Sequence, residues 1–297
     1  MREDITSRPD SLTMAGFTAL VFLVSANVIG VKFSNQELPP FWGAGTRFAC
    51  ATVLFYGVVL FQRLKFPRGR ELVGAIFFGI LQFGLGFALA YWALLEIPAS
   101  LASVILATVP LFTLIFAVIV RLESIHFRGI LGSLLAVAGT AIIFGTGTGN
   151  VIPPLYLLAA FGAVACFSLA PVVVKLYPQI HPAVMNTIGM FTGTLILFGL
   201  SLFFGESAIV PNKMETWIAQ IYLITLGSVG VFGLLLFLLK RWTASGVSYQ
   251  TVLTPIVTIG LSAWLLGEPL TSNLLAGCIF VIAGVYIGAL ASNRKNS

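Results

Sequence analysis

The chain repeats one stretch of its own sequence at a constant offset of 145 residues. Residues 99–123, ASLASVILATVPLFTLIFAVIVRLE, reappear as residues 244–268, ASGVSYQTVLTPIVTIGLSAWLLGE, and the two passages align without a gap. The same offset carries on to Gly139, which falls on Gly284. An alignment that keeps one offset from residue 99 to residue 139 indicates that the chain contains two copies of a single unit.

The composition places both copies in a lipid bilayer. Hydrophobic residues make up 58% of the chain and charged residues 9%, whereas about 25% of a soluble domain is charged. A water-soluble fold lacks the polar surface to cover so much apolar material, while lipid is itself an apolar solvent for it. The formal charge of +6 sits in short loops between apolar runs. This is the pattern that sets membrane topology, so we exclude nucleic acid as a partner.

The apolar runs are long enough to cross a membrane, which takes about 20 residues. Charged residues, prolines and glycines separate them, and the uncharged segment 145–154 links the two copies. We expect a first repeat over 12–146 and a second over 154–291. The ten predicted spans are 12–32, 41–62, 71–94, 98–120, 127–146, 154–176, 182–205, 216–239, 245–266 and 271–291.

Lysine and arginine are distributed unevenly over the two sides that these spans define. Only Lys32 and Lys213 fall on one side, and Arg47 falls within a span. The opposite side holds Arg2, Arg8, Arg63, Lys65, Arg68, Arg70, Arg121, Arg128, Lys175, Lys240, Arg241, Arg294 and Lys295. Basic residues mark the cytoplasmic side, so we expect a multi-pass protein of the plasma (inner) membrane with both termini in the cytoplasm.

Five spans in each copy is an odd number, so the second copy enters the membrane from the opposite side. The predicted fold class is therefore an all-α membrane protein of ten transmembrane helices, arranged as two inverted five-helix repeats. Inverted repeats are a feature of transporters, in which two opposed copies open a central site to either side of the membrane in turn.

Several passages resemble one known family. They are SANVIGVKF, GTRFACA, IPASLASVILATVPLFT and GVSYQTVLTPIVTIGLSAWLLGEPLT, with FSLAPVVVKL as a second copy of the first. They are similar to the drug/metabolite transporter superfamily, in its branch of EamA-type ten-helix transporters, over about residues 14–291. The resemblance implies a plasma-membrane carrier of small metabolites, often an exporter of amino acids, with a central cavity. In the first copy the aligned glutamate, Glu123, lies in the sequence RLESIH, whereas Glu268 of the second copy lies in LGE. This difference leaves the role of Glu123 open.

Arg47 is the charged side chain that lies well inside a predicted span. Such residues are costly in lipid and face the protein interior or a wet cavity. We expect Arg47 to bind a carboxylate or phosphate of the substrate. The alternative is a structural contact near the outer interface, because Arg47 follows Pro40 by only seven residues.

Polar and aromatic residues in the middle of spans form a second group of substrate-binding candidates. In lipid each polar side chain needs a hydrogen-bond partner, so these residues should point inward, and bonding between helices is the alternative role. Amides beside aromatic rings suit an amphiphilic organic solute. The candidates are Asn27, Gln82, Tyr91, Trp92, Thr108, Ser168, Asn186, Tyr249 and Gln250.

Hinge and gate candidates come in aligned pairs. Pro110 and Pro255 occupy matching positions in the repeated stretch, where each removes a backbone hydrogen bond; they act either as hinges or as static kinks. Glu123 and Glu268 follow those helices and either latch gates by pairing with basic loops or are solvated loop charges.

The ten acidic residues fall at span ends or in loops, so we expect no proton relay through a carboxylate inside the membrane. We favour facilitated diffusion or exchange.

The three cysteines are far apart in the sequence, and we expect them to be packing residues. We expect no metal, cofactor or catalytic residue. Gly284-x-x-x-Gly288 permits close helix packing and, at most, a dimer seam. We therefore expect a monomer or weak homodimer.

These features predict a carrier that moves a small amphiphilic metabolite, an amino acid or related compound, by alternating access and toward export. Its partners would be this small-molecule substrate and the lipid bilayer. Three alternatives stay open. The solute could belong to another class, such as a nucleoside, sugar derivative, drug or quaternary amine. The chain could be a non-transporting scaffold or sensor of the same fold, or an intramembrane enzyme. The last is disfavoured because His126 and His181 lie in loops without a catalytic set around them.

Overall fold

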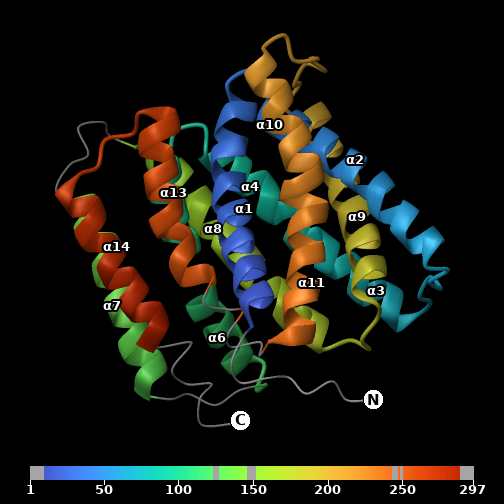
Figure 1. Ribbon diagram of the computed structural model, residues 1–297, viewed down its shortest axis with the longest axis horizontal. Coiled ribbons are helices and arrows are strands. Elements are labelled where there is room, and N and C mark those ends of the chain that lie inside the picture. The colour runs from blue at the N-terminus through green and yellow to red at the C-terminus, as the bar shows by residue number, and fades with distance from the viewer. Residues whose placement is uncertain (1–9, 123–126, 146–151, 243–246, 248–249, 288–297) are drawn as a thin grey trace. The chain divides into compact units, whose positions relative to one another are not determined.

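The computed structural model describes residues 10–122, 127–145, 152–242, 247 and 250–287, and within these residues it is helical and contains no strand (Figure 1). The α-helices are α1 Ser11–Asn35, α2 Pro40–Phe61, α3 Arg70–Gly79, α4 Phe87–Ala93, α5 Ala99–Leu106, α6 Val109–Ile119, α7 Phe127–Gly145, α8 Pro154–Lys175, α9 Pro182–Phe203, α10 Met214–Ile224, α11 Val231–Arg241, α13 Gln250–Leu266 and α14 Ser272–Val285. Two π-helical segments, η1 Ile80–Gly86 and η2 Thr225–Gly230, continue α3 and α10.

Seven helical stretches of the described chain are long and apolar enough to cross a membrane, which confirms a multi-pass membrane protein. They are Ser11–Asn35, Pro40–Phe61, Arg70–Ala93, Ala99–Ile119, Pro154–Lys175, Pro182–Phe203 and Met214–Leu235. The other three predicted spans contain the shorter apolar helices Ile130–Gly139, Leu253–Leu266 and Ser272–Val285. The total of ten spans therefore stays a prediction.

Prolines set the starts of several helices. Pro40, Pro154 and Pro182 each stand in the first turn of α2, α8 and α9, and Pro110 stands in the first turn of α6. Proline suits this place because its missing N–H is one of those that a helix start leaves without an intrahelical partner, and its fixed φ is already helical. The sequence punctuation thus predicts the starts of α2, α8 and α9 to within a residue, whereas the start of α6 falls inside the predicted span 98–120.

The chain forms two compact units. Unit 1 contains Met1–Ile29, Pro98–Val151 and Leu226–Ser297, and unit 2 contains Gly30–Ile97 and Ile152–Thr225. Each unit therefore draws on both halves of the sequence, and the units do not coincide with the two sequence repeats. The chain passes between the units four times, and two of these passages lie inside helices, in α1 after Ile29 and at the start of η2 after Thr225.

In unit 1, glycines bring α7 and α14 into close contact, and Figure 1 shows α14 lying along α7. A Cβ built on Gly139 would lie 2.7 Å from the carbonyl oxygen of Gly277, and one built on Gly284 would lie 2.5 Å from that of Gly132. Position 132 aligns with 277 and position 139 with 284, so each copy supplies the same two glycines. The pairs run in opposite directions along the two helices, as a two-fold relation between antiparallel helices requires. Gly288 lies outside the described residues.

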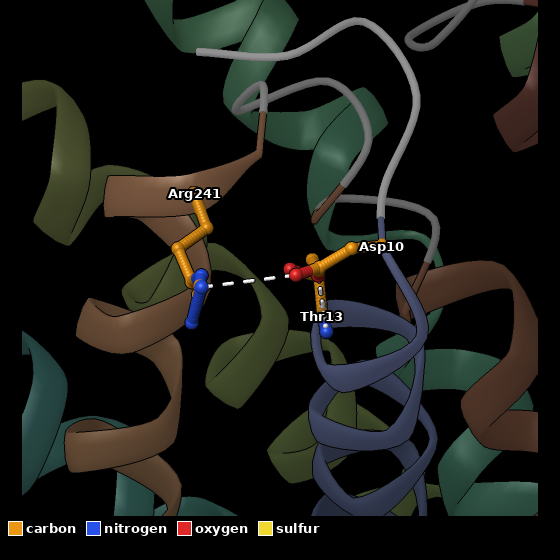
Figure 2. Close-up of polar contacts among 3 residues, drawn as sticks. All are labelled: Asp10, Thr13 and Arg241. Atoms are coloured by element: carbon orange, nitrogen blue, oxygen red, sulfur yellow. Dashed lines mark hydrogen bonds and ion pairs between the residues drawn. The ribbon is translucent and has the colours of Figure 1, made fainter. Parts of the chain in front are cut away.

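The start of α1 is held to the end of α11, also within unit 1 (Figure 2). Asp10 caps α1, because its Oδ1 accepts the Thr13 N–H at 2.8 Å, and its Oδ2 lies 3.7 Å from Arg241. The guanidinium of Arg241 also lies 5.1 Å from the centre of the Phe237 ring. Hydrogen bonds from the side chain and backbone of Thr13 hold the pKa of Asp10 below its ordinary value.

In unit 2, α2 packs along α9, and α9 also packs against α3 and η1. The packing is close because Gly189 and Gly193 lack side chains. A Cβ on Gly79 would lie 2.7 Å from the Cα of Gly189, and a Cβ on Gly193 would collide with Phe83. Gly189 and Gly193, four residues apart on α9, thus permit its close packing against α3 and η1.

The two π-helical segments begin at Ile80 and Thr225, which are 145 positions apart. This is the offset of the sequence repeat, although the residues of the two segments differ. Short π-helical stretches inside α-helices occur frequently at functional sites. η1 carries one of the substrate-binding candidates, Gln82.

Candidate substrate-binding site

Arg47 lies on α2 in unit 2 and is only 2% exposed. One guanidinium nitrogen donates a hydrogen bond to the Tyr91 hydroxyl at 3.3 Å. The guanidinium carbon lies 4.9 Å from the centre of the Phe48 ring and 5.2 Å from that of Phe87. Arg47 also interacts electrostatically with Tyr222 on α10. The structure thus brings together two sequence-predicted residues, Arg47 and Tyr91, in an aromatic setting.

The aromatic side of this cluster is built on one stretch of the third predicted span. Phe83, Phe87 and Tyr91 are four residues apart, and rings at this spacing share one helix face. The Phe83 and Phe87 rings are stacked at 6.1 Å, and the Phe87 and Tyr91 rings meet edge to face at 6.4 Å. The Asn35 side-chain amide donates to the backbone carbonyl of Tyr91 at 2.7 Å. These contacts fix the position of the hydroxyl that faces Arg47.

Sequence reasoning missed Phe48, Phe87 and Tyr222 as neighbours of Arg47. A signal for Phe87 was present, because the aromatic residues recur every four positions toward Tyr91. Tyr222 gave no such signal, since it comes from a distant helix, α10. Only the tertiary packing of unit 2 places it near Arg47.

The arrangement is suited to holding an anion. A guanidinium presents several N–H donors in a planar fork that matches a carboxylate or phosphate. Aromatic faces keep water away from the positive charge of Arg47 and stabilise it through cation–π contacts. Because the Tyr91 hydroxyl accepts from Arg47, its own proton is directed elsewhere and is a second donor for an anion.

Asn27 and Gln250 present buried amide oxygens in unit 1. The Asn27 amide nitrogen donates to the Gly227 carbonyl at 3.0 Å, but its Oδ1, like the Oε1 of Gln250, is buried without a hydrogen-bond partner among the described residues. Their helices, α1 and α13, are joined where the Ser25 hydroxyl donates to the Thr254 carbonyl at 3.2 Å. A buried acceptor without a partner is costly, so both oxygens are suited to an N–H donor from a ligand or to water.

Two other candidates already have local contacts. The Thr108 hydroxyl donates to the Ile105 carbonyl at 2.6 Å, at the break between α5 and α6. The Trp92 ring lies 5.3 Å from the Tyr156 ring in unit 2. Both contacts fit the structural alternative as well as a binding role.

The remaining candidates are dispersed over unit 2 or fall outside the described residues. Ser168 and Asn186 are buried on α8 and α9, and Gln82 is half-buried in η1. Tyr249 lies outside the described residues.

The aligned prolines have different surroundings. Pro110 follows an interruption at Ala107 and Thr108, where α5 ends and α6 begins. Pro255 lies inside α13, which continues through it. The matching sequence positions therefore give one broken helix and one continuous helix.

Glu268 caps the start of α5 within unit 1. Its Oε1 accepts the Ala99 N–H at 2.6 Å, and its Oε2 accepts the Ser100 N–H at 3.0 Å and the Ser100 hydroxyl at 2.6 Å. These N–H groups have no partner within their own helix, and the positive end of the helix dipole favours a carboxylate. Glu268 thus binds a helix start and not a basic loop. Glu123 lies outside the described residues.

Two further carboxylates cap helices in unit 2, and sequence reasoning missed both. Glu206, which follows α9, accepts the Phe41 and Trp42 N–H groups at 3.1 and 2.7 Å at the start of α2. Trp42 also donates its ring N–H to the Ile209 carbonyl at 2.8 Å. The loop after α9 is thereby fastened to α2.

Glu37, which precedes α2, makes the reverse connection. Its two carboxylate oxygens accept the Asn212 and Lys213 N–H groups at 2.7 and 3.1 Å, where α10 begins. The hydrogen bond from the Asn212 N–H holds the pKa of Glu37 below its ordinary value. The loop before α2 and the loop before α10 therefore exchange caps, each through one glutamate.

The described residues contain no group of three or more His, Cys, Asp or Glu side chains that could hold a metal ion. Cys50 is exposed, Cys166 half-buried and Cys278 buried, and all three are free thiols. The polar chemistry of the candidate site therefore rests on a guanidinium, amides and hydroxyls.

The chain is similar over most of its length to bacterial membrane transporters. A Salmonella typhimurium protein named "Probable amino-acid metabolite efflux pump" is 29% identical over 285 residues, which are 92% of this chain and 93% of the relative. An Escherichia coli protein of the same name is 26% identical over 288 residues, with the same coverage. The Escherichia coli "Uncharacterized inner membrane transporter YedA" is 25% identical over 273 residues, 91% of this chain and 88% of the relative.

A solved crystal structure has the same fold. It superposes with a TM-score of 0.66 at 18% sequence identity and covers 97% of this chain and 99% of its own. The model of the EamA-like transporter family matches residues 12–145 and 154–289, so the resemblance seen in the sequence is confirmed. The chain therefore belongs to the EamA-like transporter family and is a membrane transporter, not an enzyme.

Proposed function

We propose that this transporter exports a small amphiphilic metabolite, an amino acid or related compound, by alternating access through a central cavity between the two repeats. The observation that carries the proposal is the buried Arg47 guanidinium, which donates to Tyr91 between the faces of Phe48 and Phe87. Relatives named amino-acid metabolite efflux pumps support the substrate class and the direction.

Arg47 accounts for the anionic end of such a substrate. A buried guanidinium keeps a strong field because little water screens it, so it favours a ligand that brings a negative charge. The planar fork favours a carboxylate or phosphate over a halide or a neutral solute. The aromatic rings provide apolar contact for the part of the ligand next to that group.

Unit 1 offers a separate set of acceptors in the amide oxygens of Asn27 and Gln250. Each lacks a hydrogen-bond partner among the described residues, and each is an acceptor that suits an ammonium or amide N–H. An amino acid carries both a carboxylate and an ammonium group. The Arg47 cluster of unit 2 suits the carboxylate of such a compound, and the amide oxygens of unit 1 suit an N–H donor such as its ammonium group.

Inverted repeats are part of the proposal and have support in both compact units. The reciprocal glycine contacts of α7 and α14 have the antiparallel order of a two-fold relation. The π-helical segments recur at the offset of the sequence repeat, one in each unit. Two opposed copies of one framework can exchange conformations, and this exchange is the basis of alternating access.

We propose that both termini lie in the cytoplasm and that the protein resides in the inner membrane. The distribution of lysine and arginine supports the orientation, and the relative named as an inner membrane transporter supports the location. Each described acidic residue lies at a helix end or in a loop. Facilitated diffusion or exchange therefore fits better than coupling through a carboxylate inside the membrane.

Flux into proteoliposomes tests the proposal, with panels of amino acids, their acetylated or amidated derivatives, nucleosides, sugars and quaternary amines. Arg47→Gln should lower transport of carboxylate-bearing solutes by about tenfold or more, because a hydrogen bond to a charged group is lost. Arg47→Lys keeps the charge without the fork and should retain part of the activity. Lys213→Gln removes an exposed cation and serves as the control.

Three results would contradict the proposal. Movement of nucleosides, sugars or quaternary amines in preference to amino acids would assign another solute class. Equal loss for all solutes in Arg47→Gln, together with a lower melting temperature, would give Arg47 a purely structural role. No protein-dependent flux of any solute, from a folded protein, would favour a scaffold or sensor.

A further inference from the structure

An apolar groove of about 820 Å³ runs along the outside of unit 2 between α2, α3 and α9. Val53 on α2 is 69% exposed and Leu195 on α9 is 59% exposed on its walls. Such residues would face the acyl chains of a bilayer, since lipid is the solvent of an exposed apolar surface in a membrane protein. The groove is thus open to lipid and is not part of the Arg47 cluster.

The threonine hydroxyls of the groove are already satisfied by its own helices. The hydroxyls of Thr52, Thr187, Thr192 and Thr194 each donate to the backbone carbonyl four residues earlier, at 2.7 to 2.9 Å. These threonines present methyl groups and bonded oxygens to the groove. An occupant therefore has to be apolar along this part of its length.

A second hollow, of about 770 Å³, adjoins the groove and is polar. It lies between the loop after α2 and the loop before α9, and its walls include Lys65, Arg68, Gln179 and His181. Phe66 lines both hollows, so the two are neighbours and share a wall. The Phe66 ring is 48% exposed and lies 6.1 Å from the Tyr56 ring, at the point where groove and hollow meet.

The charge of the second hollow is positive. Lys65 and Arg68 outnumber its carboxylate, Glu71. His181 accepts the Ala183 N–H at its Nδ1, at 3.3 Å, so its other ring nitrogen carries the proton and is a further donor. A group with negative charge and several acceptor oxygens is complementary to this set.

We propose that this site binds an anionic phospholipid. One acyl chain lies in the groove, the phosphate is held by Lys65 and Arg68, and the aromatic pair of Tyr56 and Phe66 stands at the boundary between them. Aromatic side chains at this boundary and basic side chains beyond it are the usual order at a membrane interface.

The sequence favours the cytoplasmic leaflet of the membrane for this site. Both loops lie on the side of the predicted spans that carries most of the lysine and arginine. This is the expected cytoplasmic side, where basic pockets between transmembrane helices bind anionic headgroups. Lipid at this site would brace α2, α3 and α9 of unit 2 from outside.

The test is lipid binding by the purified full chain in neutral detergent, followed by native mass spectrometry and by thermal unfolding. Dioleoyl phosphatidylglycerol is compared with dioleoyl phosphatidylcholine, which has the same acyl chains and no net charge. We expect phosphatidylglycerol to bind more tightly and to raise the melting temperature more. Glycerol phosphate, which has the anionic group without the chains, should bind far more weakly than the lipid.

Matched variants distinguish lipid binding at this site from a general attraction of anionic lipid to the basic surface. Lys65→Gln with Arg68→Gln should weaken phosphatidylglycerol binding by about tenfold, because two basic contacts are lost. Arg63→Gln with Arg70→Gln removes the same charge from the same segment but not from the hollow, and should bind nearly as well as the unaltered protein. Ala49→Phe fills the groove and should weaken both lipids.

Equal weakening by the two double variants would overturn the proposal, because it would show attraction to surface charge alone. Equal binding of the two phospholipids, or binding of glycerol phosphate as tight as that of the lipid, would also overturn it. None of these measurements involves substrate flux. The lipid proposal and the transport proposal can therefore fail separately.

Discussion

The side-chain amide of Asn27 donates a hydrogen bond to the backbone carbonyl of Gly227 at 3.0 Å and so joins α1 to η2. Both residues belong to unit 1 and lie near its limits, because the chain leaves unit 1 after Ile29 and re-enters it at Leu226. The bond therefore joins two segments of unit 1 that are far apart in the sequence. A π-helical turn leaves backbone carbonyls without the usual helical partners, and a side-chain donor can satisfy one of them.

Substitution of Asn27 should separate its two functions. Asn27→Ala removes both the donor to Gly227 and the buried Oδ1, whereas Asn27→Asp keeps the acceptor oxygens and loses the donor. We expect Asn27→Ala to unfold about 1 kcal/mol more easily, since one hydrogen bond is lost, and Asn27→Asp to lose more, because a carboxylate oxygen would then face the Gly227 carbonyl. Asn27→Asp should retain more transport of ammonium-bearing solutes than Asn27→Ala. Equal fluxes in the two variants would show that Oδ1 does not contact the substrate.

Glu268 should matter for the stability of unit 1. Glu268→Gln keeps the shape of the side chain but loses the charge that attracts the Ala99 and Ser100 N–H groups. We expect a loss of about 1 kcal/mol, typical of a helix cap, seen as a lower melting temperature in detergent. Ser100→Ala removes only the hydroxyl contact and should cost less. An unchanged melting temperature for Glu268→Gln would show that the cap does not contribute to stability.

Glu37 should make the stability of unit 2 depend on acid pH. Its pKa is lowered from an ordinary value of 4.5 by the Asn212 N–H, so the ionised form is favoured in the folded protein. The stabilisation is present above the ordinary value and is lost as the pH falls through the lowered one. The difference in melting temperature between the unaltered protein and Glu37→Gln should therefore shrink as the pH falls from 6 toward 3. A difference that stays constant over this range would contradict the assignment.

The close contact of α9 with η1 should tolerate no side chain at Gly193. Gly193→Ala places a Cβ against Phe83 and should destabilise the protein by about 1 to 3 kcal/mol through overpacking. Gly199 lies on the same helix, and a Cβ there meets nothing within 4 Å among the described residues. Gly199→Ala should be neutral or slightly stabilising because alanine is the better helix former. Similar melting temperatures for the two variants would contradict this packing.

Much of the fold could be predicted from the sequence, because a helix that crosses lipid needs a long apolar run. Apolar runs between prolines and charges mark the helices, and Pro40, Pro154 and Pro182 stand where the helices begin. The division into compact units could not be predicted, since it depends on packing between segments of both halves.

The sequence was enough to predict Arg47 as a candidate site residue, but it did not reveal the aromatic side chains around it. A charge inside an apolar span is rare enough to single out Arg47, and Tyr91 was chosen for its polar group. The targets of the glutamates were not predictable. Glu37, Glu206 and Glu268 bind backbone N–H groups, which every residue except proline possesses, so no particular amino acid marks the partner.

The glycine contact between α7 and α14 has the form of an interface between two identical chains, although both helices belong to one polypeptide. In a pair of separate five-helix subunits, a substitution at one position would change both sides of the interface together. Within one polypeptide each side varies alone, and asymmetry becomes possible. α9, the second helix of the second copy, has no charged residue to match Arg47 of α2. A single-chain protein can thus carry one buried arginine at this place where a symmetric dimer would be obliged to carry two.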